Sequence, residues 1–257
     1  MLAADIYDYI VVGAGSAGAA VAARLSEHAQ VLLLEAGPAD RNLWTRIPLG
    51  MAKLLSQGRL LRRYRTDPEP RLDDRRIDWP RGWTVGGSSA VNGLIWVHGV
   101  PHEYDRWPGD GCPGWSYAEV LPYFRAMETS WRGENAWHGN TGPLPVQPID
   151  TRLLLHDPLM RSAAAAGFAT SADLHAEVEE GFARGEVTID ARGRRASTAR
   201  AYLDPVNTRP NLTVLTGALT ERVLVENGRA TGVQFRRNGA VETARAAGEV
   251  LLAGGAY

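Results

Sequence analysis

The sequence predicts an α/β fold built on a doubly wound parallel sheet, and three stretches near the start of the 257-residue chain carry that prediction. Residues 6–12 are short, apolar and β-branched and end at a glycine, which is typical of a buried strand. Residues 16–26 are rich in alanine and indicate a helix, and residues 31–34 form a second apolar run that closes on Glu35. Strand, helix and strand in so short a span indicate a βαβ unit.

The last third of the chain predicts a β-meander. Short β-prone runs alternate with turns, and Asn227-Gly228 and Asn238-Gly239 are dipeptides typical of type I′ hairpins. Residues 249–253 are apolar and predict a further buried strand. Between the two regions the chain is less regular, with one helix expected over 118–128 and a basic run at 59–65 that favours a solvated face.

Composition excludes several classes of function. A formal net charge of −1 argues against a nucleic-acid binder that works by broad phosphate neutralisation. The single cysteine, Cys112, cannot form an intramolecular disulfide or a multi-cysteine metal site. The first residues lack the features of a secretory signal, and no apolar run reaches the roughly 20 residues that span a bilayer. We therefore expect a cytoplasmic protein without a transmembrane segment.

Gly13, Gly15 and Gly18 have the G-x-G-x-x-G spacing of a dinucleotide-binding loop. In such a loop the first glycine allows a tight turn, the second lets backbone approach a pyrophosphate, and the third packs the helix on the strand. The helix N-terminus then offers unpaired N–H groups to the phosphates. Glu35 follows at the usual distance of about 20 residues and can accept hydrogen bonds from the adenosine ribose. This spacing predicts a Rossmann-like site and leaves NAD and FAD both open.

A second glycine-rich stretch, Gly86-Gly87-Ser88-Ser89, precedes another apolar run. Two consecutive glycines are conformationally expensive, so we expect close backbone approach there. Ser88 or Ser89 is a suitable N-cap for a following helix. A second glycine-rich turn of this kind could hold a further part of a long cofactor such as FAD, with Asn92 and Gly93 near the flavin ring.

Several stretches together resemble the glucose–methanol–choline (GMC) flavin oxidoreductases, and most closely their choline-dehydrogenase-like members. The resemblance covers essentially the whole chain, in the family's order, through DYIVVGAGSAGAAVAARLSE, VLLLEAGP, PRGWTVGGSSAVNGLIWVHG, YDRWPGDGCPGWSYAEVLPYFRAME, HGNTGPLPV, STARAYLDP and NLTVLTGALTERVLVENGRATGVQF. It implies FAD as the cofactor and a three-layer FAD-binding fold.

By this resemblance Gly13, Gly15, Ser16 and Ala17 would hold the pyrophosphate and Glu35 the ribose. Residues 81–87 and 92–95 would line the flavin and its ribityl chain, and Val223 would contact adenine through its backbone, or else be a plain strand residue. Val91 stands where some relatives carry a flavin-linked histidine, which implies noncovalent FAD. The full expected set is Gly13, Gly15, Ser16, Ala17, Gly18, Glu35, Ala36, Arg81, Gly82, Gly86, Gly87, Ser88, Asn92, Gly93, Leu94, Ile95, Val223 and Ala253.

The resemblance also implies that this chain is the N-terminal half of a longer enzyme. The family's second signature begins at Gly255-Ala256, and its catalytic histidine is expected beyond Tyr257. We therefore predict no catalytic residue and no metal site here, and expect each of the six histidines to be structural or exposed. Residues 1–145 and 190–257 are expected to form the FAD-binding domain, and 146–189 part of a mixed α+β substrate domain. A C-terminal half is the expected partner.

The complete enzyme would oxidise a small-molecule alcohol. A base would take the hydroxyl proton while the α-carbon passes hydride to flavin N5. Two alternatives stay open at this point: a non-catalytic fragment or FAD-binding scaffold, and a GMC-fold enzyme with other flavin chemistry, such as a lyase or a photodecarboxylase. The alcohol and the electron acceptor are not specified by the sequence.

Overall fold

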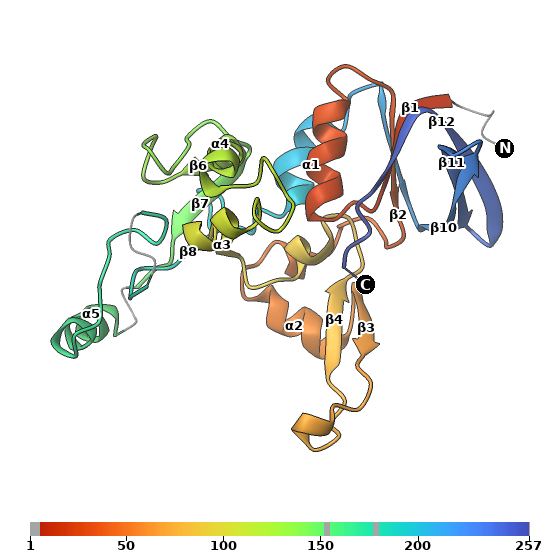
Figure 1. The fold of residues 1–257 in the computed structure, drawn as a ribbon. Helices are drawn as coiled ribbons and strands as arrows, with labels where there is room; N and C mark the ends of the chain where they lie inside the picture. The colour runs from red at the N-terminus through yellow and green to blue at the C-terminus, as the bar shows by residue number, and fades with distance from the viewer. Residues whose placement is uncertain (1–5, 152–154, 177–179, 257) are drawn as a thin grey trace. The chain divides into compact units, whose positions relative to one another are not determined.

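The computed structural model describes residues 6–151, 155–176 and 180–256 (Figure 1). The chain divides into two compact units: the first unit is Met1–Gly93 with Arg195–Tyr257, and the second unit is Leu94–Arg194. These limits differ from the expected boundaries, because strand pairing joins residues 95–96 to 186–187 and so brings residues 94–145 into the second unit. The substrate-binding role of 146–189 stays a prediction.

A six-stranded mixed sheet organises the first unit, in the order β10-β11-β12-β1-β2-β9. The strands β12, β1, β2 and β9 are parallel neighbours, and β10, β11 and β12 form the predicted antiparallel meander. The elements are β1 (Ile6–Val12), α1 (Ser16–Leu25), β2 (Val31–Glu35), α2 (Gly50–Gln57), β3 (Leu61–Arg65), β4 (Asp78–Gly82), β9 (Leu212–Thr216), β10 (Ala218–Glu226), β11 (Arg229–Arg237) and β12 (Ala240–Leu252).

Strands β1 and β2 are buried on both faces. Val11 and Leu33 pack in one apolar cluster with Ala19 and Ala22 of α1. Their neighbours Ile10 and Leu32 point the other way, into a cluster with Val233 and Phe235 of β11 and Ala244 of β12. Because side chains alternate along a strand, β1 and β2 thus pack on α1 with one face and on the meander strands β11 and β12 with the other (Figure 1). The predicted α/β, three-layer fold is confirmed.

The two predicted hairpin turns are present in the meander. Asn227 and Gly228 have φ of 51° and 78°, the left-handed values that a type I′ turn requires at both central positions. Nothing lies within 4 Å of a Cβ placed on Gly228, so replacement there adds only a conformational cost.

Gly228→Ala is therefore expected to lower the free energy of unfolding by about 1 kcal/mol. Urea denaturation followed by circular dichroism measures this loss. Gly254→Ala is the control, because that glycine has the same open space without a left-handed φ. Equal effects of the two substitutions would contradict the assigned turn.

Strand β12 corrects one expectation. The run 249–253 is not a separate strand, because β12 is continuous over 13 residues and exchanges partners along its length. Residues Ala240 to Arg245 pair antiparallel with β11, and Arg245 to Leu252 pair parallel with β1. The expected burial was also wrong at Leu252, whose side chain belongs to neither apolar cluster and whose exposed fraction is 70%.

The second unit has a four-stranded sheet of order β5-β8-β7-β6. The predicted helix over 118–128 is confirmed as α4, which begins with a capping box between Ser116 and Glu119. The elements are β5 (Ile95–Trp96), α3 (Pro101–Arg106), α4 (Tyr117–Met127), β6 (Glu128–Ser130), β7 (Leu144–Pro148), α5 (His156–Ala165) and β8 (Glu186–Val187). Among the residues described, no helix is long and apolar enough to cross a bilayer.

Candidate functional site

A cleft of about 730 Å³ lies in the first unit, at the carboxyl ends of β1 and β2 and the N-terminus of α1. This edge of an open α/β sheet is where ligands bind in such folds. Its lining consists of Val12, Gly13, Gly15, Ser16, Ala17, Leu34, Glu35, Ala36, Arg62, Tyr64, Arg81, Gly82, Trp83, Ser88, Ala218, Leu219, Thr220, Ala253, Gly254, Gly255 and Ala256.

The glycine loop and α1 present backbone N–H groups to this cleft. Gly15 is the N-cap of α1, and no side chain caps the helix or places an acidic group in its first turn. The first N–H groups of an α-helix have no partner within the helix, and together with its dipole they favour an anion. At Gly18 a Cβ would collide with the carbonyl of Gly13, so only glycine lets the helix start this close to the loop. The loop has the form predicted from its spacing.

Glu35 closes the opposite side of the loop. Its Oε2 accepts a hydrogen bond from the Ala14 amide at 2.9 Å, and its Oε1 accepts one from the Gly37 amide at 2.8 Å. Burial raises the pKa of Glu35, while the hydrogen bonds from Gly37 and Ala14 act in the opposite direction. Each carboxylate oxygen keeps a further lone pair, so the group can still accept from a ligand hydroxyl.

The second glycine pair packs against the first glycine loop. The Gly86 amide donates to the Ala14 carbonyl at 2.7 Å. Gly87 has a φ of 52°, and a Cβ there would lie 2.7 Å from the Cα of Gly15. The expected close backbone approach is therefore to the chain's own dinucleotide loop.

The prediction of a helix after these glycines is wrong. Residues Gly87–Ala90 form a single 3₁₀ turn whose N-cap is Gly86, in place of Ser88 or Ser89. The serine side chains have other partners: Ser88 Oγ accepts from the Gly82 amide at 3.1 Å, and Ser89 Oγ donates to the Gly86 carbonyl at 2.6 Å. A turn this short has no substantial helix dipole.

Arg195 is a supporting residue that sequence reasoning missed. It is 1% exposed, and its guanidinium donates to the carbonyls of Ser89 and Pro48, both at 3.2 Å, and to Asn92 Oδ1 at 3.0 Å. It thereby joins the segment after the second glycine pair to a distant loop. In the sequence, Arg195 lies just before the STARAYLDP stretch, and this position gave no indication that the side chain is buried.

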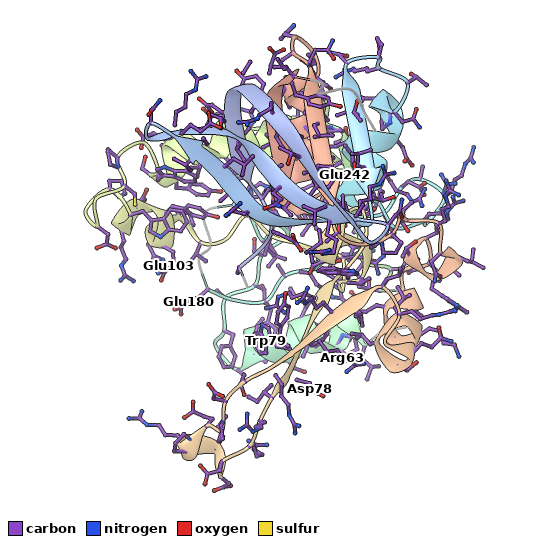
Figure 2. All side chains as sticks on the ribbon, turned by 90° about the vertical axis from the view of Figure 1, so that its right-hand side faces the viewer. Arg63, Asp78, Trp79, Glu103, Glu180 and Glu242 are labelled. Carbon is purple, nitrogen blue, oxygen red and sulfur yellow. The ribbon has the colours of Figure 1, made fainter. Side chains whose placement is uncertain are left out.

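The β3–β4 hairpin supplies a basic wall of the cleft. Figure 2 shows Arg63, Asp78 and Trp79 along its two strands, which pair antiparallel. Arg62 and Tyr64 of β3 and Arg81 of β4 line the cleft. The basic run 59–65 is therefore not simply a solvated face: residues two apart share one side of a strand, which brings Arg62 and Tyr64 to the site together.

Many of the predicted site residues line the cleft, and others lie elsewhere in the structure. Ten line the cleft: Gly13, Gly15, Ser16, Ala17, Glu35, Ala36, Arg81, Gly82, Ser88 and Ala253. Gly18, Gly86 and Gly87 support the two loops from behind. Asn92 and Gly93 do not belong to the lining, and Leu94 and Ile95 belong to the second unit. Val223 packs on the apolar core, and β10 reaches the cleft through Ala218, Leu219 and Thr220.

Comparisons with known proteins agree on one family. A family model described as GMC oxidoreductase matches residues 7–257. Oxygen-dependent choline dehydrogenases from Yersinia pseudotuberculosis and Paraburkholderia phytofirmans are 45% and 44% identical, over 97% and 99% of this chain. Each match spans 46% of the relative, so the chain has about half the length of these proteins.

Solved structures give the same result. Pyridoxine 4-oxidase from Mesorbium loti superposes with a TM-score of 0.90 and 32% identity, covering 97% of this chain and 49% of that one. A formate oxidase from Aspergillus oryzae has a TM-score of 0.87 and 26% identity, covering 98% and 46% of the two chains. This chain belongs to the GMC oxidoreductase family.

Proposed function

We propose that this chain forms the FAD-binding part of an enzyme that oxidises an alcohol to a carbonyl compound. The observation that carries the proposal is the cleft, where an uncapped helix N-terminus, a close glycine loop and a buried carboxylate meet. These are the groups that a dinucleotide requires: N–H donors for the pyrophosphate and an acceptor for the ribose.

The residues present fit FAD. Ser16 and Ala17 at the start of α1, with Gly13 and Gly15, would hold the pyrophosphate through their backbone, and Glu35 would accept from the adenosine ribose. Arg62 and Arg81 would add positive charge on the hairpin wall, complementary to the two phosphates. When bound, FAD supplies an acceptor for the hydride that leaves the alcohol carbon.

Noncovalent binding is part of the proposal. Val91 is 6% exposed and has no group that can bond to the flavin, and by the resemblance it stands where some relatives carry a flavin-linked histidine. The alcohol class rests on family membership and on relatives named choline dehydrogenase and pyridoxine 4-oxidase. A complementary C-terminal half is the proposed partner, and we expect this chain alone to bind flavin without oxidising alcohol. The cytoplasmic location stays a prediction from the sequence.

The visible spectrum of the purified, gel-filtered chain tests flavin binding. We expect flavin absorbance to co-elute with the protein, and acid precipitation to release it into the supernatant. A colourless, folded chain that also fails to take up added FAD would overturn the proposed site. For the reaction, alcohol-dependent bleaching of the flavin under anaerobic conditions is the test once the chain is joined to a C-terminal half.

Glu35→Gln is expected to weaken FAD binding at least about tenfold, as loss of a charge-assisted hydrogen bond does. It also places an NH₂ donor against one of the two amides that Glu35 accepts from, so the thermal midpoint should fall. FAD titration followed by flavin fluorescence measures the affinity. Glu249→Gln, an exposed substitution on β12, is the control and should leave both values unchanged. Unchanged affinity in Glu35→Gln would remove this residue from the ribose site.

A further inference from the structure

The second unit buries a polar cluster that the cleft does not use. His98, Glu128 and His138 are 1%, 0% and 0% exposed, and Asp173, His175, Glu186 and Arg132 surround them. The three central residues follow β5, begin β6 and lie in the loop before β7, so their spacing in the sequence resembles no metal motif. The sequence predicts each histidine to be structural or exposed, and these two histidines are buried.

Among the described residues, carboxylates outnumber permanent cations in this cluster. Three carboxylates, from Glu128, Asp173 and Glu186, face a single permanent cation, Arg132. His138 lies between two of these carboxylates, Glu128 and Asp173. Uncompensated charge is costly inside a protein, so these buried carboxylates would stabilise a bound cation.

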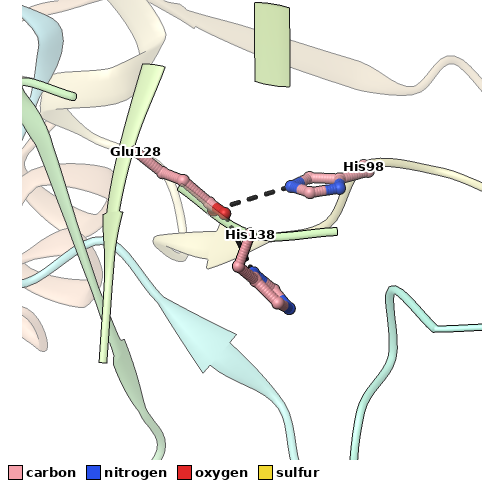
Figure 3. Close-up of side chains that lie close together, drawn as sticks. All are labelled: His98, Glu128 and His138. Carbon is pink, nitrogen blue, oxygen red and sulfur yellow. Dashed lines mark hydrogen bonds and ion pairs between the residues drawn. The ribbon is translucent and has the colours of Figure 1, made fainter. Parts of the chain in front are cut away.

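Figure 3 shows the carboxylate of Glu128 directed toward His98 and His138. His138 Nδ1 lies 2.9 Å from Glu128 Oε1, and His98 Nε2 lies 3.5 Å from Glu128 Oε2. The second distance is too long for a good hydrogen bond, and within the described residues neither ring nitrogen of His98 has a hydrogen-bond partner. Donors around a tetrahedral zinc ion lie about 3.3 Å apart, which the two distances bracket.

The surrounding contacts are those that orient metal ligands. His138 Nε2 lies 3.0 Å from the Asp173 carboxylate, and a carboxylate on the outer nitrogen is the usual partner of a metal-bound histidine. Glu128 is held in turn by Trp96 Nε1 at 2.7 Å and by the Gly139 amide at 3.1 Å. Asp173 and His175 also line a cavity of about 250 Å³, which offers a route for an ion.

We propose that His98, Glu128 and His138 form a buried structural site for a divalent transition-metal ion of the zinc type. Each of the three residues offers one ligand atom, and these atoms lie within 4.8 Å of one another. Two imidazoles and a carboxylate suit Zn²⁺. All three residues are buried, which favours a structural ion over a catalytic one. The proposal is independent of flavin binding.

Metal analysis of the full chain tests this site, with an affinity tag that contains no histidine. We expect about one zinc ion per chain after purification or after dialysis against zinc. His98→Asn and Glu128→Gln should each lose most of this metal. His102→Asn is the matched control, because that histidine is half-exposed, pairs with its neighbour Glu103 and is not one of the three proposed ligands, so this variant should keep the metal.

A measurement on the unmodified chain guards against variants that fail to fold. The chelator-treated protein should gain several degrees in thermal midpoint with zinc, saturating near one equivalent. Cobalt should give the visible absorption of a tetrahedral ion. Less than about a tenth of an equivalent of metal, with no midpoint change on adding zinc, would overturn the site and leave a network of protons and carboxylates.

Discussion

Arg195→Met is expected to lower the free energy of unfolding by about 3 kcal/mol and to loosen the segment after the second glycine pair. The substitution leaves the carbonyls of Ser89 and Pro48 and the side-chain oxygen of Asn92 without their buried donor. Burial lowers the pKa of Arg195 to about 10, and the charge of Asp40 acts in the opposite direction. The contribution of Arg195 to stability comes from the directed hydrogen bonds of its planar guanidinium group. Chemical denaturation measures the loss.

Two further variants make that result specific. Arg195→Lys keeps the charge but not the planar fork, and should recover less than half of the lost stability. Arg192→Met removes an exposed arginine three residues earlier and should change stability by less than about 0.5 kcal/mol. Full recovery by lysine would show that charge alone, and not the three directed contacts, holds this segment.

Gly87→Ala is expected to cost about 3 kcal/mol and to abolish retention of flavin during gel filtration. The new methyl group would occupy a left-handed backbone position and press on the backbone of Gly15, which cannot move without opening the dinucleotide loop. Denaturation and the flavin-to-protein absorbance ratio are the two readouts.

Gly93→Ala is the matched control for that variant. Its Cβ would have open space and no left-handed φ, so stability should stay within about 0.5 kcal/mol of the parent chain. A stable Gly87→Ala protein that retains flavin would mean that the two glycine loops separate freely, contrary to the contact described above.

Sequence patterns predicted the features that depend on local chemistry. The βαβ unit, the glycine loop with Glu35 and the two Asn-Gly hairpins each depend on a few neighbouring residues, and each is present. The short turn after Gly87 was not predictable in this way, because it depends on what Ser88 and Ser89 contact. Local capping preference favoured a helix, and tertiary hydrogen bonds decided otherwise.

Residues that act through long-range contacts were missed for the same reason. Arg195 meets Pro48 and Ser89 across more than 100 residues of chain, and His98 meets Glu128 and His138 from separate elements. Nothing in their immediate neighbours distinguishes them from surface residues. Arg62 and Tyr64 were within reach of the sequence, because their two-residue spacing on a strand places them on one side.

The pairing of β1 with β12 has a consequence for how the chain is made. Ile6 pairs with Arg245 and Val12 with Leu252, so the central strand emerges from the ribosome long before its neighbour exists. At usual elongation rates the delay is on the order of ten to fifty seconds. During that time the apolar strand β1 lacks its partner β12, and β2 lacks its second neighbour, β9. Nascent chains of this protein should therefore depend on chaperones that bind exposed strands until β12 is complete.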